Sequence, residues 1–171
     1  MAKEVISQEL LDKIEANSSE IEKAVSDITS VYSDELDEYV RWVRQLLRES
    51  DSAGPITDTE LDDIVMNLST IIYFTSTGCE QLGIREDISR SAYKEAYNTA
   101  RSMLSTGTVA DKNAEAEIQT LQERIVEIIF SRSYKILKAK VENAQELLAS
   151  AKKIISRRVS EYELSRIQVN K

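Results

Sequence analysis

Apolar residues recur every three or four positions along most of the chain, the spacing typical of a helix with one apolar face. The pattern is longest after residue 109, where neither glycine nor proline occurs as far as residue 168. A helix of about sixty residues would be roughly 90 Å long, so its apolar stripe predicts other long helices, or other copies of the chain, beside it. The stripe consists of Ile118, Leu121, Ile125, Ile128, Ile129, Ile136, Leu137, Val141, Ala144, Leu147, Leu148, Ala151, Ile154, Ile155, Val159 and Tyr162.

A second long pattern runs from residue 7 to about residue 50 and fits a seven-residue repeat with two core positions. We expect polar residues at these positions, such as Ser18 and Glu35, to set how the helices pair. The outer face is acidic around residues 34–38, which is typical of a solvated helix face. One core position holds Leu11, Ser18, Val25, Tyr32, Tyr39 and Leu46, and the other holds Ile14, Ile21, Ile28, Glu35 and Trp42.

Turn and capping residues divide the remainder of the chain. Gly54 and Pro55 mark a loop, and Thr57 with Glu60 forms the capping box that begins a helix over 57–82. Gly83 followed by an apolar residue has the pattern of a glycine helix end. A further helix is expected over 86–105.

The last helix has its own start signal. Gly107 suits the end of the helix before it, and Thr108 with Asp111 resembles a second capping box. The pattern as a whole predicts an all-α fold, an elongated antiparallel helical bundle or coiled coil. Two long helices over 7–50 and 109–168 would enclose two shorter ones, within a single domain covering 1–171.

Composition narrows the chemistry. The chain contains no histidine and a single cysteine, Cys79, which we expect to be a small core residue. Histidine-dependent nucleophiles and a zinc site within one chain are therefore disfavoured. We predict a protein that is not an enzyme, with no catalytic residue, no metal and no cofactor. An enzyme that uses only carboxylates is the alternative.

The beginning of the sequence lacks the apolar core of a signal peptide, and the apolar run at 71–74 is far too short to span a bilayer. We therefore predict a cytoplasmic protein with no membrane partner. The single cysteine fits a reducing compartment.

Charge is divided along the chain. The total is −8, but residues 1–90 carry 8 basic and 20 acidic side chains, whereas residues 91–171 carry 14 basic and 10 acidic ones. Helical geometry places Lys140, Arg158 and Arg166 near the apolar stripe, where they suit pairing with acids of the first helix. A further set points outward: Arg124, Arg132, Lys135, Lys153 and Arg157.

Two interpretations of the basic half stay open. The cations can neutralise the acidic N-terminal helix, or the outward set can contact phosphates, with a steep dependence on salt. Tyr97 and Arg101 lie one turn apart on the helix over 86–105. A tyrosine beside a basic group can stack on a base and hold a phosphate, or it can line a helix–helix contact.

Three short patterns lie between residues 97 and 165: Ala100-Arg101 with Met103 to Gly107, then Tyr134, Leu137 and Val141, then Ile154 to Arg158 with Glu161. Together they resemble the UvsY family of phage recombination mediators. Members of that family are small, helical and oligomeric. They bind single-stranded DNA and help to load a recombinase onto strand covered by single-stranded-DNA-binding protein.

The resemblance implies a role in DNA recombination for this chain, as a homo-oligomer that binds single-stranded DNA and a recombinase or other protein partner. It also implies the residues of the DNA or partner side: Arg124, Arg132, Lys135, Lys153 and Arg157, with Tyr97 and Arg101 added. The alternative is a structural or adaptor coiled coil that binds other proteins, such as a virion component or a host-directed inhibitor.

Overall fold

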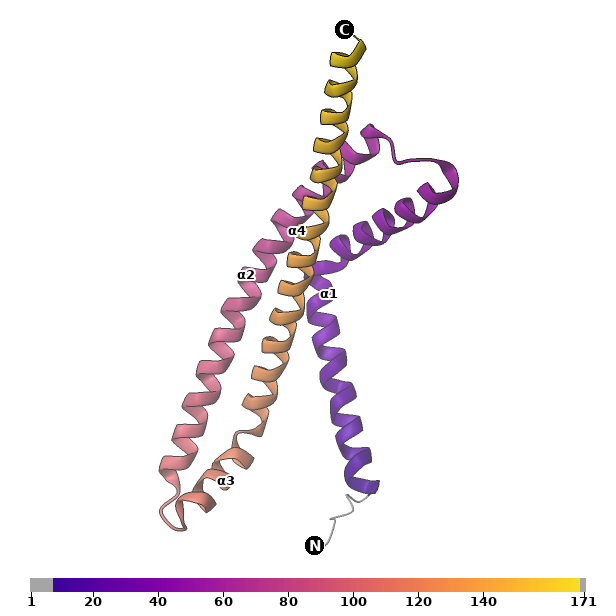
Figure 1. Cartoon of the computed structure of the whole chain (residues 1–171). Helices are drawn as coiled ribbons and strands as arrows, with labels where there is room; N and C mark the ends of the chain where they lie inside the picture. The colour runs from indigo at the N-terminus through magenta and orange to yellow at the C-terminus, as the bar shows by residue number, and fades with distance from the viewer. Residues whose placement is uncertain (1–7, 170–171) are drawn as a thin grey trace, which may run out of the picture. The chain divides into compact units, whose positions relative to one another are not determined.

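The computed structural model describes residues 8–169, and the side chains of residues 18–49 and 54–167. Four helices follow one another along the chain (Figure 1): α1 (Gln8–Ala53), α2 (Asp58–Met103), α3 (Val109–Gln119) and α4 (Leu121–Val169). The described residues form no strand. The all-α helical bundle predicted from the sequence is confirmed.

The contacts between helices group into two compact units. Unit 1 combines the chain up to Val31 with Glu80–Ile136, and unit 2 combines Tyr32–Cys79 with the chain from Leu137 onward. Three of the helices, α1, α2 and α4, contribute residues to both units. The expectation of a single domain stays a prediction.

The predicted helix end at Gly83 was wrong, because α2 continues through this position as one helix to Met103. Gly83 instead lies close to the aromatic ring of Tyr134 on α4. A Cβ atom at Gly83 would be 3.2 Å from Cε2 of that ring. The glycine therefore makes room for a side chain of a neighbouring helix, which is a common reason for an isolated glycine inside a helix.

The uninterrupted helix predicted over 109–168 was also wrong, because the chain changes direction at Thr120 between α3 and α4. The Thr120 hydroxyl donates a hydrogen bond to the Ala116 carbonyl at 2.8 Å, and both residues are buried. Ile118 and Leu121, which the continuous stripe placed in the core, are exposed.

The seven-residue repeat predicted for α1 holds in its first described turns and then loses register. Val25 is buried as expected, but Glu35 and Trp42 are exposed, and Leu36 and Val43 are buried in their place. A straight α-helix drifts by about 20° per heptad relative to a 3.5-residue repeat, so the core face moves to neighbouring positions. The side chains of Leu11 and Ile14 lie outside the described residues.

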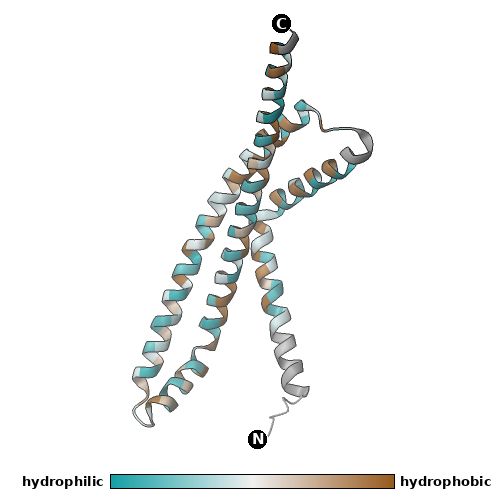
Figure 2. Cartoon of the chain, in the orientation of Figure 1, coloured by the Kyte–Doolittle hydropathy of each residue, from teal (hydrophilic) through white to brown (hydrophobic). Residues whose placement is uncertain are grey.

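Unit 2 has a well-formed apolar core. One cluster consists of Leu36, Leu68, Ile71, Ile72, Val141 and Ala144, and a second consists of Val43, Ile64 and Ala151. Each cluster contains residues of α1, α2 and α4. Brown, hydrophobic positions recur along these helices in Figure 2. Cys79 is buried in this unit, as the sequence predicted.

Polar contacts join α1 to both α2 and α4 in unit 2. The Tyr39 hydroxyl on α1 donates to the Asp63 carbonyl on α2 at 3.1 Å. The Lys140 ammonium on α4 forms an ion pair with Asp37 on α1 and donates to the Ser33 hydroxyl at 2.9 Å. This is the pairing predicted for Lys140 with the acidic first helix.

The core of unit 1 contains Val25 and Leu82, but has a larger share of small and polar side chains than the core of unit 2. The buried residues of unit 1 include Glu86, Ser89, Ser131 and Ser133, together with Ala100 and Ala116. The Ser133 hydroxyl has no hydrogen-bond partner in the described part of the chain, and Glu86 is held by an ion pair with Arg90. Such a core removes less apolar surface from water than the leucine and isoleucine core of unit 2.

Both capping boxes predicted from the sequence are confirmed. The Glu60 carboxylate accepts a hydrogen bond from the Thr57 backbone N–H at 2.7 Å, and the Glu60 N–H donates to the Thr57 hydroxyl at 3.2 Å. Thr108 and Asp111 form the same arrangement at the start of α3. Hydrogen bonds from the two threonines lower the pKa of each carboxyl below its ordinary value.

We expect Gly78→Ala to destabilise the protein, although alanine is the better helix former by about 1 kcal/mol. A Cβ atom at Gly78 would lie 2.6 Å from Cδ1 of the Tyr32 ring, close to the ring's attachment point. Overpacking of this kind costs about 1–3 kcal/mol, so after the gain in helix propensity the net loss should be up to about 2 kcal/mol. Chemical denaturation measures it, with the neighbouring exposed Thr77→Ala as the control. Equal stability of both variants would contradict the packing argument.

Native-state hydrogen exchange should show that α2 opens more readily in unit 1 than in unit 2. The backbone amides around Ser89 should exchange faster than those around Leu68, because the apolar clusters of the described chain lie in unit 2. Mass spectrometry of peptides from the two halves of α2 provides the comparison. Stronger protection around Ser89 would show that the polar core is not the weaker one.

The capping box at Thr57 makes stability depend on pH. Because the folded-state pKa of Glu60 is lowered, its stabilising contribution is present above the ordinary value of 4.5 and is lost as the pH falls through the folded-state pKa. NMR titration of the Glu60 carboxyl should show this low pKa, and Thr57→Val should move the pKa back upward. The Asp111 carboxyl in the same variant is the internal control and should not move.

Candidate nucleic-acid interface

The structure places the seven sequence-predicted interface residues in both units. Unit 1 holds Tyr97 and Arg101 on α2, and Arg124, Arg132 and Lys135 on α4; unit 2 holds Lys153 and Arg157 on α4. Tyr97 is half-buried and the six cations are exposed. The predicted outward direction of the basic set is therefore correct, and its role in binding stays a prediction.

A contact between α2 and α4 in unit 1 joins a cation to two tyrosines. The Arg124 guanidinium donates a hydrogen bond to the Tyr93 hydroxyl at 3.0 Å, and its Cζ lies 5.5 Å from the centre of the Tyr93 ring. The Tyr93 and Tyr97 rings are 6.2 Å apart between centroids, with an interplanar angle of 49°. We call Tyr93, Tyr97 and Arg124 the tyrosine–arginine cluster.

The hydrogen bond with Tyr93 raises the pKa of Arg124 above its already high ordinary value, and nearby Glu117 and Glu127 add to the shift. The guanidinium therefore stays charged and carries a fixed orientation at the surface. A planar cation held in place loses less conformational entropy when it binds a phosphate than a free side chain does.

Local structure explains how the cluster forms. Tyr93 and Tyr97 are one turn apart on α2, so they lie on the same side of the helix. The chain then turns back through α3, whose capping box fixes its start, and α4 begins three residues before Arg124. This turn brings α4 against the same stretch of α2 that carries the tyrosines (Figure 1).

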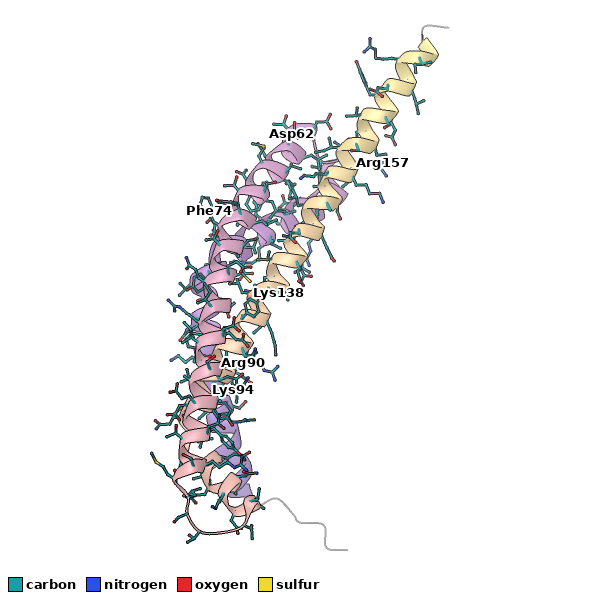
Figure 3. All side chains as sticks on the ribbon, turned by 90° about the vertical axis from the view of Figure 1, so that its left-hand side faces the viewer. Asp62, Phe74, Arg90, Lys94, Lys138 and Arg157 are labelled. Carbon is teal, nitrogen blue, oxygen red and sulfur yellow. The ribbon has the colours of Figure 1, made fainter. Side chains whose placement is uncertain are left out.

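A stripe of residues on one side of α2 passes through Tyr97 of the cluster. Its members are spaced by four, three and four residues: Arg90, Lys94, Tyr97 and Arg101. Lys94 and Arg101 are exposed. Arg90 forms an ion pair with Glu86 and lies 3.9 Å from Asp87. Figure 3 shows Arg90 and Lys94 next to each other along α2. We call this set the unit 1 basic stripe.

Arg132 and Lys135 lie on the outer side of α4 in the same unit. By helical geometry these two residues and Arg124 fall within an arc of about 80°. The cavity near the end of α2, of about 550 Å³, has a different character because Glu95 and Glu123 line it. Acidic side chains repel phosphate, so this cavity does not extend the basic surface.

The two predicted cations of unit 2 have acidic neighbours. The Arg157 Nε lies 3.6 Å from a carboxylate oxygen of Glu161, the next turn along α4. Glu146, seven residues before Lys153, is also exposed and lies on the same side of the helix. These acids weaken the positive potential around Lys153 and Arg157, as Glu86 and Asp87 do around Arg90 in unit 1.

The cations predicted near the apolar stripe, Lys140, Arg158 and Arg166, differ in their contacts. Arg158 donates to the Asp58 carboxylate at 2.6 Å and to the Ile56 carbonyl at 2.7 Å. Its acidic partner therefore belongs to α2. The prediction that Arg158 pairs with an acid of the first helix was wrong. Arg166 is exposed.

Sequence reasoning did not include Tyr93 among the site residues, although its spacing from Tyr97 was visible. The missing information was its contact with Arg124, because that contact depends on the turn at Thr120. Lys94 and Arg90 lie within the helix predicted over 86–105, so their spacing from Tyr97 and Arg101 was also visible in the sequence.

Other classes of site find little support in the described residues. Among the side chains that the structure describes, residues 18–49 and 54–167, no group of three or more acidic or cysteine side chains is arranged to hold a metal ion. None of the described helices combines the length and apolar content that a membrane span requires. Comparisons with models of protein families, with curated proteins and with solved structures found no match to this chain.

Proposed function

We propose that the protein is a non-enzymatic accessory protein that binds single-stranded DNA through unit 1, in the manner of a recombination mediator. The proposal includes self-association, a cytoplasmic location, in the host if a phage encodes the chain, and a recombinase as protein partner. The observation that carries it is the tyrosine–arginine cluster, which shares Tyr97 with the unit 1 basic stripe. The resemblance of residues 97–165 to UvsY proteins agrees with it.

The cluster supplies the two interactions that single-stranded nucleic acid requires. A tyrosine ring stacks on a base whatever its identity, and cations along a groove hold the backbone. In this proposal a base stacks at Tyr97, while Lys94, Arg101 and Arg124 contact the flanking phosphates. Arg132 and Lys135 extend the path along α4, and Lys153 with Arg157 provide a weaker contact in unit 2.

Self-association explains how a protein with a net charge of −8 binds a polyanion. One unit 1 basic stripe offers only a few phosphate contacts and modest affinity. Copies joined in an oligomer raise the effective concentration of one stripe beside another, so that overall affinity rises without any new type of contact.

The test is a titration of fluorescently labelled oligothymidine, followed by anisotropy at several salt concentrations. If about four cations are engaged, log K should fall against log salt with a slope of roughly −3. Tyr97→Ala should weaken binding roughly 5- to 150-fold, because stacking contributes about 1–3 kcal/mol per base. Absence of binding at low salt would overturn the proposal.

Three charge-matched double variants locate the interface. Arg101→Gln with Arg124→Gln removes two cations from unit 1 and should reduce affinity at least about tenfold. Lys153→Gln with Arg157→Gln should reduce it less. Arg44→Gln with Arg48→Gln removes two exposed cations of α1 and should have the smallest effect. Equal losses for all three pairs would show that binding follows net charge and not this surface.

A second candidate, a structural or adaptor protein that binds other proteins, is favoured by the outer side of α2 in unit 2. Met66 and Tyr73 are exposed by 70% and 69%, and Phe74 is exposed beside Tyr73. Figure 3 shows Phe74 at the outer edge of α2. Exposed apolar groups at helical spacing are typical of a protein-binding face. Lack of DNA binding in the titration would favour this function.

A further inference from the structure

In unit 2, α4 extends beyond the point where its neighbour α2 begins. Arg158 of α4 pairs with Asp58, the first residue of α2. The helix then continues to Val169, which adds about 16 Å at 1.5 Å per residue. Every described side chain from Val159 to Ile167 is exposed. Figures 1 and 3 show this yellow end of α4 projecting past the start of α2.

The projecting segment keeps the apolar pattern of the packed part of the helix. Ala144 and Ala151 are buried on the inner side of α4, and the same side continues through Ile155, Val159 and Tyr162 at helical spacing. Val159 is 52% and Tyr162 is 65% exposed. A helix end that has the pattern of a packing surface and whose apolar side chains are exposed is typical of an interface.

A surface cavity of about 420 Å³ lies at the base of this segment. Its apolar lining comes from Ile155, Val159 and Tyr162, and its polar edge from Arg158, Asp58 and Asp62. Arg158 is already paired with Asp58, whereas Asp62 makes no ion pair with any described residue. A complementary partner therefore presents an apolar or aromatic side chain and, about one turn away, a cation.

The end of α4 itself carries this combination, because Arg166 follows Tyr162 by four residues and is exposed without an ion pair among the described residues. In an antiparallel pair of α4 ends with the two Tyr162 residues at the midpoint, Arg166 of one copy lies opposite Arg158 of the other. Asp58 already neutralises Arg158 there, and Asp62, one turn further along α2, lines the same cavity about 6 Å from that level by helical rise. The exposed apolar side chains and the charges of the segment are thus complementary to those of a second copy.

We propose that a second copy of the chain docks on this surface, so that two α4 ends pack antiparallel across the cavities at their bases. Each copy contributes Val159 and Tyr162 to a shared apolar layer. Each also places Arg166 against Asp62 of the partner subunit, which gives two equivalent ion pairs. A helix end of about three turns is too short to form a stable coiled coil alone, so the start of α2 is a necessary part of the interface.

The inference deepens the self-association included in the proposed function, and it does not require that DNA is bound. The interface is small, so we expect dissociation on the order of micromolar concentration, as for transient interfaces. Sedimentation velocity of the full chain without DNA, from about 1 to 100 µM, measures it. A monomer over the whole range would overturn the inference.

Reciprocal charge changes provide the decisive comparison. Asp62→Arg alone and Arg166→Asp alone should each weaken association about tenfold or more, since each places two like charges opposite each other. The double variant Asp62→Arg with Arg166→Asp should restore association, because the pair is re-formed with its signs exchanged. Failure of the double variant to recover would overturn the proposed pairing.

Tyr162→Glu tests the apolar layer and should give a monomer, while Ser160→Glu, on another side of the same helix turn, should associate as the natural chain does. All these positions on α4 are exposed, so circular dichroism should show unchanged helix content. Association that persists in Tyr162→Glu would place the contact elsewhere and overturn this surface. DNA titration of the same variants separates the two proposals, since binding of DNA by a monomer supports the interface in unit 1 alone.

Discussion

The contact of three helices around Leu68 and Ile72 is the interaction on which unit 2 depends. These α2 residues pack with Leu36 of α1 and with Val141 and Ala144 of α4 in one cluster. The apolar surface removed from water drives the association, but such contacts are not directional and would tolerate sliding of one helix along another. The ion pair between Lys140 and Asp37, supported by Ser33, adds direction because a shift by one turn would leave charges without partners.

Periodicity and capping residues were sufficient to predict the class of fold and the starts of α2 and α3. The middle of α2 was not predictable in the same way. Gly83 followed by an apolar residue is the usual pattern of a helix end, and only the ring of Tyr134, distant in sequence, shows why the glycine is inside a helix. The turn at Thr120 has no glycine or proline to mark it. Both differences arise from tertiary contacts that override local propensity.

The sequence was sufficient to predict which cations of the candidate site point outward. It was not sufficient to predict which side chains of the site contact one another. Angular position on a helix correctly placed Arg124 and Arg132 at the surface, because that property depends on local geometry alone. The contact of Arg124 with Tyr93 depends on how the chain returns through α3. The acids that neighbour Lys153 and Arg157 were present in the sequence, but their effect became clear only when the exposed side chains of the same helix face were compared.

Trp42 is the only tryptophan of the chain, and it lies in unit 2 beside the ring of Tyr39, with a centroid distance of 5.2 Å. Its side chain is 43% exposed. Tryptophan emission is consequently a local optical probe that reports on unit 2, whereas the tyrosine–arginine cluster contributes only weaker tyrosine emission. A fluorescence melting curve of this protein follows one part of the bundle, and events at Tyr93 and Tyr97 require a different spectroscopic signal.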